Sequence, residues 1–378
     1  MSLTRAALAL TLSLCVVAWP AASDDDPVPA VWPLAAAWSN NFPVADAISL
    51  VMGPSRLFVV EPAEVSAWND GTLLWKSGLR ANARPVTDEG RVFVSSGDTI
   101  HALSDANGTE QWRVVVGKIP VSPAARSGWL IVPGEDGSLQ GINASQGREI
   151  WRIALPAPLT APVDIDGDLV FGACADGLIR AWQIADGAVR WTRELGTRPL
   201  QLLATKGEVF VGGEDGRLRA LRQRDGRIDW TYDLAMPIAG ALAADDRHIY
   251  AATIDNSVHA HSFNGHQAWH QLLAARVVDG MFSDSGRVYV PQSNGEIRIF
   301  LAKDGKRAGR LNASPAEATV IGGLVAAGAG DQLQIALTVS AGSQLTVTTY
   351  RRTGIGAPPA TSAPPATPLL LSLRGGRP

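Results

Sequence analysis

Four histidines in the second half of the chain come nearest, by residue type and spacing, to a chemical site. His259 and His261 stand two apart in an alternating stretch, so on a β-strand both would face the same side. With His266 or His270 they would supply nitrogen ligands, and zinc would need a third ligand at about 2.0–2.1 Å. The stretch recurs along the chain, however, and the position of His259 is taken there by His101, Arg180, Arg219 and Arg298. We therefore predict a recurring polar position and no metal site.

Other reactive patterns are missing from the sequence. It contains no phosphate-binding glycine loop, no nucleophile elbow and no paired HExxH motif. The formal net charge of −3, with 18 % charged residues, gives no electrostatic footprint for nucleic acid. These features predict a protein that is not an enzyme and that binds neither a cofactor nor nucleic acid.

The first 23 residues have the layout of an export signal. Arg5 supplies the positive charge, residues 6–19 the apolar core and residues 20–23 the small-residue cleavage zone. The apolar run is too short for a membrane span and no second candidate follows, so we expect a mature chain without a transmembrane segment, periplasmic or secreted. Cys15 follows Leu14, where lipidation needs a small residue, which argues against a lipid anchor. Cys174 is the other cysteine, so the mature chain can form no internal disulfide.

Internal repetition decides the architecture, because a fixed period indicates a repeat fold. A Gly-x-x-x-Trp pattern recurs every 37 to 40 residues. Its tryptophans are Trp75, Trp112, Trp151, Trp191, Trp230 and Trp269, and its glycines are Gly71, Gly108, Gly147, Gly187, Gly226 and Gly265. A seventh copy keeps Gly305 but has Gly309 at the tryptophan position.

Each repeat contains about four short strand-like runs. An apolar run such as GRVFV (90–94) or GEVFV (207–211) is followed by an Asx-Gly pair, a second alternating run, another turn and the tryptophan run. Asx-Gly pairs between alternating runs are strong hairpin signals, because both turn positions tolerate positive φ. Four short antiparallel strands per unit, repeated in tandem, predict an all-β propeller.

The count of blades depends on the two ends of the repeat region. Residues 318–350 offer three strand-like stretches but no fourth, whereas residues 34–42 precede the first unit and place Trp38 37 residues before Trp75. We predict eight four-stranded blades over residues 34–350, with this N-terminal strand completing the last blade and removing open sheet edges; seven blades is the alternative. Residues 351–378 are rich in proline and predict a flexible tail.

The regular tryptophans have a structural explanation. A large flat side chain at a fixed level fills the gap between neighbouring blades, and burying one removes roughly 150–250 Å² of surface from water. Small residues recur in the preceding strand, where a neighbour must approach closely; they are Ala102, Ala181, Ala220 and Ala260.

The repeat resembles the PQQ-like (quinoprotein-type) propeller repeat, as in DGLIRAWQIADGAVRW (176–191) and DGRLRALRQRDGRIDW (215–230). The layout is similar to that of the BamB family, the propeller component of the outer-membrane β-barrel assembly machinery. Shared points are the size, the eight units, the opening AAWS (36–39) and a seventh unit without its tryptophan. The resemblance implies a non-catalytic periplasmic scaffold that binds protein partners in the cell envelope, that machinery among them.

The chain departs from this family at three points. Members are usually lipid-anchored, and their partner-facing Leu-x-Leu-Arg segment after the third blade has no match here, where Trp151 is followed by RIALPAPLTAPV. The proline-rich tail is also foreign to them. A similar stretch one blade later contains Arg198, Leu200 and Leu202; with Trp129, which follows a turn, these are our candidate partner-binding residues.

The same repeat also builds quinoprotein dehydrogenases, so a PQQ-binding oxidoreductase or cofactor-binding relative is the alternative function. If the resemblance extended to these enzymes, it would imply a calcium ion held by several convergent oxygens and a vicinal cysteine pair that covers the quinone. This chain has no vicinal cysteines and no long insertions between its repeats. Binding without catalysis is therefore the prediction.

Overall fold

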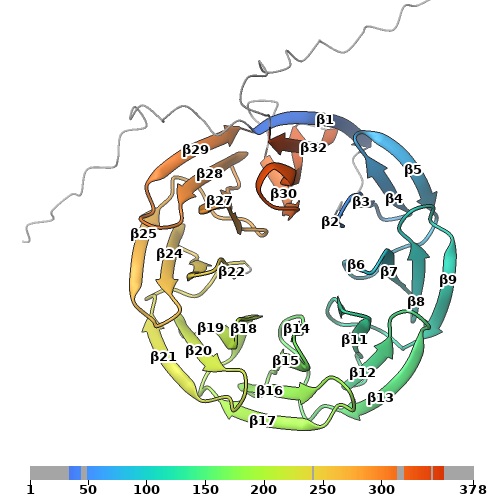
Figure 1. The fold of residues 1–378 in the computed structure, drawn as a ribbon, viewed down its shortest axis with the longest axis horizontal. Coiled ribbons are helices and arrows are strands. Elements are labelled where there is room, and N and C mark those ends of the chain that lie inside the picture. The colour runs from blue at the N-terminus through green and yellow to red at the C-terminus, as the bar shows by residue number, and fades with distance from the viewer. Residues whose placement is uncertain (1–33, 44–48, 241, 313–318, 342–343, 353–378) are drawn as a thin grey trace, which may run out of the picture.

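The structure, a computed structural model, describes residues 34–43, 49–240, 242–312, 319–341 and 344–352. The predicted signal peptide, and the predicted tail beyond residue 352, lie outside these residues. The described residues form eight four-stranded antiparallel sheets around a common axis (Figure 1), which confirms the predicted eight-bladed propeller.

Blades 1 to 4 follow the chain, each running from an inner to an outer strand. Blade 1 contains β2 (Ser49–Met52), β3 (Leu57–Val60), β4 (Val65–Asn69) and β5 (Thr72–Ser77). Blade 2 contains β6 (Val86–Asp88), β7 (Arg91–Ser96), β8 (Thr99–Ser104) and β9 (Glu110–Val115). Blade 3 contains β10 (Ala124–Arg126), β11 (Trp129–Pro133), β12 (Ser138–Asn143) and β13 (Arg148–Ala154). Blade 4 contains β14 (Asp164–Asp166), β15 (Leu169–Ala173), β16 (Leu178–Gln183) and β17 (Val189–Glu194).

Blades 5 to 7 repeat the pattern and blade 8 changes it. Blade 5 contains β18 (Pro199–Thr205), β19 (Glu208–Gly213), β20 (Arg217–Arg222) and β21 (Ile228–Asp233). Blade 6 contains β22 (Ala243–Ala244), β23 (His248–Ala252), β24 (Ser257–Ser262) and β25 (Gln267–Leu272). Blade 7 contains β26 (Phe282–Asp284), β27 (Arg287–Pro291), β28 (Glu296–Leu301) and β29 (Arg307–Asn312). Blade 8 contains β30 (Thr319–Ala327), the 3₁₀ helix η1 (Gly330–Gln332), β31 (Gln334–Ala341), β32 (Gln344–Arg352) and, outermost, β1 (Leu34–Pro43).

Residue types follow the position of each strand in its blade. The second strand of each blade has neighbouring blades on both sides and is mainly apolar: β3 (LFVV) and β15 (LVFGA) are buried over their whole length. The outer strands face solvent, so they alternate; on β17 only Trp191 is buried. The apolar core therefore lies between the blades.

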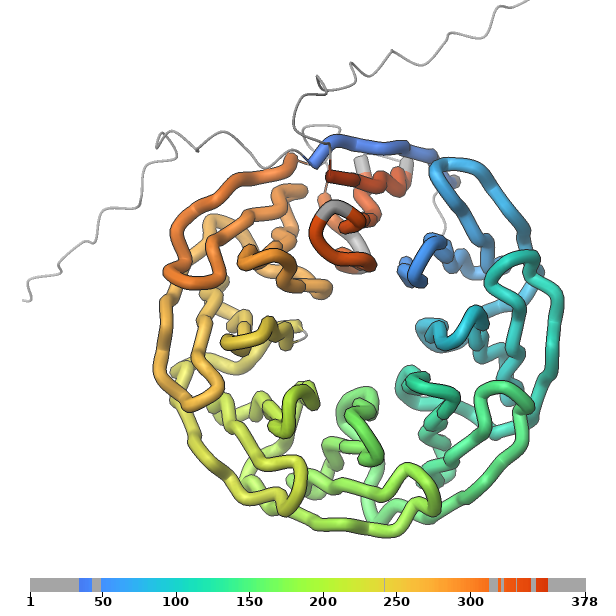
Figure 2. Tube along the Cα trace, in the orientation of Figure 1, coloured from blue at the N-terminus to red at the C-terminus, as the bar shows by residue number. Residues whose placement is uncertain are grey.

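The N-terminal strand closes the ring as predicted. β1 pairs antiparallel with β32, with Trp38 opposite Thr349 and Ser39 opposite Thr348. The Oγ atoms of that second pair are hydrogen-bonded at 2.8 Å. Figure 2 shows this first described strand beside the last one, completing blade 8 on its outer side. β32 extends to Arg352, two residues beyond the predicted end of the propeller.

The ring has two faces, which we name by their turns. Face A carries the turns between the first and second and between the third and fourth strands of each blade, such as residues 89–90 and 105–109. Face B carries the turns between the second and third strands, such as residues 97–98, and the connections between blades, such as residues 116–123.

Candidate functional site

The repeated tryptophans join each blade to the next. The Trp191 indole Nε1 on blade 4 donates a hydrogen bond to the carbonyl oxygen of Gln223, in a face A turn of blade 5, at 2.6 Å. The same bond is made by the other five repeat tryptophans, Trp75, Trp112, Trp151, Trp230 and Trp269, to the carbonyls of Asp105, Ala144, Ile184, Phe263 and Ala302. The indole thus contributes both apolar area and a directional link.

The repeat glycine lies where the neighbouring indole packs. A Cβ placed on Gly108 would approach a Trp75 ring carbon to 2.6 Å, and the residue has φ +70°. Gly147, Gly187, Gly226, Gly265 and Gly305 meet the preceding tryptophan in the same way, and Gly71 meets Trp38 at 3.2 Å. Both the turn and the close approach require glycine here. The Gly-x-x-x-Trp spacing therefore places the glycine of one blade under the tryptophan of the previous one.

Blade 7 has no tryptophan because blade 8 has no turn to receive one. The outer strand of blade 8 is β1, which is not joined directly to β32, so the described part of blade 8 has no turn to supply the glycine and carbonyl that receive the tryptophans of blades 1 to 6. Gly309 takes the tryptophan position and lies opposite Ile299, where blades 1 to 6 have alanine or glycine. The gap is filled by a cluster that includes Ile299, Leu311, Leu34 and Tyr350.

The histidine position is a recurring polar site, and blade 6 is its exception. In blades 4 and 5 the Nη2 atoms of Arg180 and Arg219 lie 2.5 Å from carboxylate oxygens of Asp176 and Asp215, four residues earlier. The equivalent His259 is 8 % exposed, and neither ring nitrogen has a partner among the described residues. Its ring lies 4.7 Å from that of His270, between centroids. Within the described residues no group of three or more His, Cys, Asp or Glu side chains could hold a metal ion.

Burial determines the charge state of two histidines. Desolvation, with a smaller effect from the neighbouring His270, lowers the pKa of His259 to about 4. Desolvation also lowers the pKa of His261 to about 4, where the ring packs 4.1 Å from that of Tyr232 on blade 5. Both are therefore neutral at pH 7; His261 packs against blade 5, and His259 packs against His261 and His270 of its own blade.

The structure does not bring the four candidate partner-binding residues together. Arg198 is exposed just before β18, on face B of blade 5, and Leu200 lies beside it in an irregular step of that strand. Leu202 packs on the apolar cluster between blades 4 and 5. Trp129 begins β11 of blade 3, on face A, and packs partly on another cluster. Only Arg198 and Leu200 share a surface.

Two exposed apolar side chains on face B were not identified from the sequence. Met236 is 41 % exposed and Ile254 is 50 % exposed, on adjacent face B loops joined by a hydrogen bond from the Ile254 amide to the Pro237 carbonyl. In register with Ile254, blades 3, 4, 5 and 7 have Glu135, Ala175, Glu214 and Ser293. An alignment of the repeats would have shown that isoleucine is unusual at this position, but it would not have shown that the Ile254 side chain is exposed. We name Arg198, Leu200, Met236 and Ile254 the face B patch.

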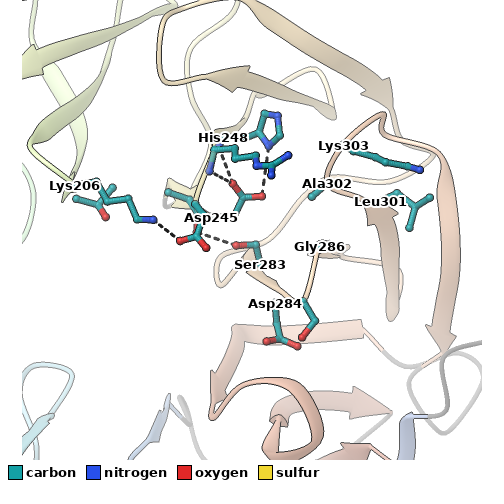
Figure 3. Close-up of a pocket in the computed structure, with 14 residues that line it drawn as sticks. Lys206, Asp245, His248, Ser283, Asp284, Gly286, Leu301, Ala302 and Lys303 are labelled. Atoms are coloured by element: carbon teal, nitrogen blue, oxygen red, sulfur yellow. Dashed lines mark hydrogen bonds and ion pairs between the residues drawn. The ribbon is translucent and has the colours of Figure 1, made fainter.

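A cavity with a volume of about 630 Å³ lies on face A. It is formed by the turns of blades 5, 6 and 7 (Figure 3). Asp245 organises one wall: its carboxylate accepts hydrogen bonds at 2.6 Å from the Arg247 and His248 amides and from the Tyr250 hydroxyl. Burial alone would raise the pKa of Asp245, but these hydrogen bonds outweigh it and hold the pKa below its usual range. Burial, together with the hydrogen bond to Asp245, raises the pKa of Tyr250.

Comparison with known proteins gives the family. The family described as "Outer membrane protein assembly factor BamB" matches residues 34–121, 96–238 and 214–354, which together span all eight blades. The chain belongs to the BamB family.

Individual relatives are distant. The chain is 28 % identical to the outer membrane protein assembly factor BamB of Yersinia pestis over 205 residues, which are 47 % of this chain and 52 % of that protein. The match thus spans about half the length of that relative. The crystal structure of BamB from Moraxella catarrhalis superposes with a TM-score of 0.65 at 16 % identity and covers 84 % of this chain and 98 % of its own.

The BamB fold is shared with enzymes. The quinohemoprotein alcohol dehydrogenase of Comamonas testosteroni superposes with a TM-score of 0.67 at 12 % identity, over 87 % of this chain and 78 % of its own. Identity this low shows the fold alone. Among the described residues of this BamB-family chain, no helix is long and apolar enough to span a membrane.

Proposed function

We propose that this chain is a non-catalytic, protein-binding scaffold of the cell envelope that serves outer-membrane protein assembly. The observation that carries the proposal is the family match, because it extends over every blade rather than over one repeat. The predicted export signal is consistent with a periplasmic location. The competing function, PQQ-dependent oxidation, is supported only by likeness of fold.

We further propose that the face B patch is the docking surface for the assembly machinery. Met236 and Ile254 lie on loops that the ring holds in place, and a half-exposed apolar pair beside a charged residue is typical of an interaction site. Arg198 adds an exposed cation close to the Glu214 turn, whose amide donates to the Arg198 carbonyl at 2.9 Å. A partner with an apolar segment and an acidic group would complement this patch.

Affinity capture from envelope extracts tests both proposals. The tagged wild-type chain should recover subunits of the β-barrel assembly machinery, and Met236→Asp with Ile254→Asp should reduce that recovery roughly tenfold or more, because a charge would be buried at the contact. Val189→Asp is the matched control: Val189 is 59 % exposed on the outer strand β17, away from face B, and its replacement should leave recovery unchanged.

Three outcomes would contradict the proposals. Reproducible capture of another partner without the assembly subunits would overturn the assembly role. Equal loss in the Val189→Asp control would overturn the assignment of the surface. Uptake of PQQ with calcium, seen as quinone absorbance that stays with the purified protein, would favour the enzymatic alternative.

A further inference from the structure

Blade 2 and blade 3 show how this fold seats a carboxylate on a face A turn. The Asp88 carboxylate, at the end of β6, accepts hydrogen bonds from the Ser127 amide at 3.1 Å and from the Gly128 amide at 2.7 Å. Those two residues form a turn with φ values of +53° and +80°. Successive amides in such a turn point the same way and make a concave anion site.

Blade 7 contains the same turn without its carboxylate. Ser285 and Gly286 have φ values of +48° and +72°, so their amides are arranged as in the blade 3 turn. The residue of blade 6 that corresponds to Asp88 is Asp245, which instead folds back onto its own turn and onto Tyr250. Within the part of the chain that the structure describes, the Ser285 and Gly286 amides have no acceptor.

Asp245 and the Ser285 and Gly286 turn that it does not bind both line the cavity on face A. The Ser285 and Gly286 turn lines one side of this 630 Å³ space, and Figure 3 shows Gly286 and Asp245 on the two sides of it. The blades remain linked beneath it by the Ser283 hydroxyl, which donates to the Ala244 carbonyl at 2.8 Å. A volume of this size is in the range, roughly 300–1,000 Å³, of sites for small ligands.

The cavity lining includes cationic side chains that have no partner among the described residues. Arg247 and Lys303 both line it, and neither side chain has a hydrogen-bond or ion-pair partner among the described residues. Arg247 stands where the corresponding turns of blades 2, 3, 5 and 7 have glycine, so the scaffold does not require it. Lys206 pairs with Asp246, which is almost fully exposed, and such a pair exchanges partners at little cost.

The acidic side chains of the cavity are already occupied. Asp245 is satisfied by its own turn, and Asp284 accepts a hydrogen bond from the Gly330 amide of blade 8 at 3.0 Å. Among the described residues of the lining, the Ser285 and Gly286 amides and the Arg247 and Lys303 side chains are therefore donors without partners. We propose that this cavity binds the carboxylate of a small acidic ligand, seated on the Ser285 and Gly286 amides, with Arg247 and Lys303 supplying the positive charge.

Calorimetric titration of the full chain at low ionic strength tests the proposal with two probes: citrate, as a free organic acid, and a short acidic peptide. We expect millimolar or tighter binding of at least one probe. Arg247→Ala and Lys303→Ala should each weaken it about fivefold, as expected for partly exposed charge-assisted contacts. Asp246→Asn should instead tighten binding by about threefold, because it removes a negative charge and frees Lys206.

Arg224→Ala provides the matched control, because Arg224 is an exposed cation of another face A turn, paired with Asp225 at 3.6 Å and outside the cavity lining. Absence of binding by both probes would overturn the proposal. Equal weakening by Arg224→Ala, or weaker binding by Asp246→Asn in a protein with unchanged thermal unfolding, would also overturn it. The site lies on the face opposite the face B patch. Absence of anion binding would therefore leave the assembly role standing, and failure of the assembly role would leave the anion site standing.

Discussion

His259 and His261 show how a single position can matter to the ring without performing chemistry. Both are buried and neutral, and their pKa values of about 4 lie well below the ordinary value of about 6.5. The unfolded chain therefore binds more protons than the folded one between these two values. The free energy of unfolding should fall as the pH drops from about 6.5 to about 4, by at most roughly 3 kcal/mol for each histidine.

Glu208 has the opposite dependence on pH. Burial, with a smaller effect from Asp229, raises the pKa of Glu208 to about 7, so its contribution to stability is lost as the pH rises from about 4.5 to about 7. Thermal unfolding at pH 4.5 and pH 7.5 separates the effect of the two histidines from that of Glu208. His259→Arg with His261→Leu, the residue types found in other blades, should remove most of the loss of stability at acid pH, whereas Glu208→Gln should leave this loss unchanged or increase it. An unchanged pH dependence in the histidine variant would contradict this assignment.

At the scale of the element, the unit of construction is the interface between a tryptophan strand and the next face A turn. Trp191→Ala removes the indole, its hydrogen bond to Gln223 and the packing on Gly226, and should lower the free energy of unfolding by about 3–5 kcal/mol.

Gly309→Trp restores the repeat sequence in blade 7 but should lower the free energy of unfolding by about 1–3 kcal/mol, because the indole would meet buried Ile299 and no receiving turn. Urea denaturation measures both changes. A higher unfolding midpoint for Gly309→Trp would show that the turn is not what the tryptophan requires.

These elements also show how far sequence reasoning reached. The blade count and the pairing of β1 with the last blade could be predicted, because turn residues and tryptophans repeat with the period of the blade. The proposed binding surfaces could not be predicted, because exposure depends on which strands become neighbours. Leu202 lies in a stretch that is only similar to a family segment and packs on the apolar cluster between blades 4 and 5, whereas Met236 and Ile254 belong to no such stretch and are exposed. Arg247 interrupts the glycine of the repeated turn, but only the fold shows that its turn faces a cavity.

For the whole molecule, closure is the property that separates a ring from a linear repeat array. Inner-strand contacts link successive blades, such as Asp88 to Gly128 and Asp164 to the Ala204 amide, each joining residues 40 apart. The discontinuity of the chain lies within blade 8, where β1 and β32 are paired but not consecutive, so closure depends on this pairing. Blade 8 then contacts blade 1 through the stacking of Trp38 on Trp68 at 5.9 Å and the ion pair of Arg351 with Asp70. Linear arrays of repeats can unfold from their ends, whereas a closed ring has none.

Weakening this one junction should therefore change how the molecule unfolds, and not only how stable it is. We expect the wild-type ring to unfold in one transition, with tryptophan fluorescence and circular dichroism coincident, and Trp38→Ala to separate an early transition, as blades 8 and 1 open, from a later one. Ser39→Cys with Thr348→Cys would place a disulfide where the two side chains already touch, and should restore a single transition in the Trp38→Ala background until it is reduced. Coincident transitions for Trp38→Ala would mean that the eight blades cooperate without the contact of Trp38 with Trp68, because the pairing of β1 with β32 would then be sufficient to hold the ring.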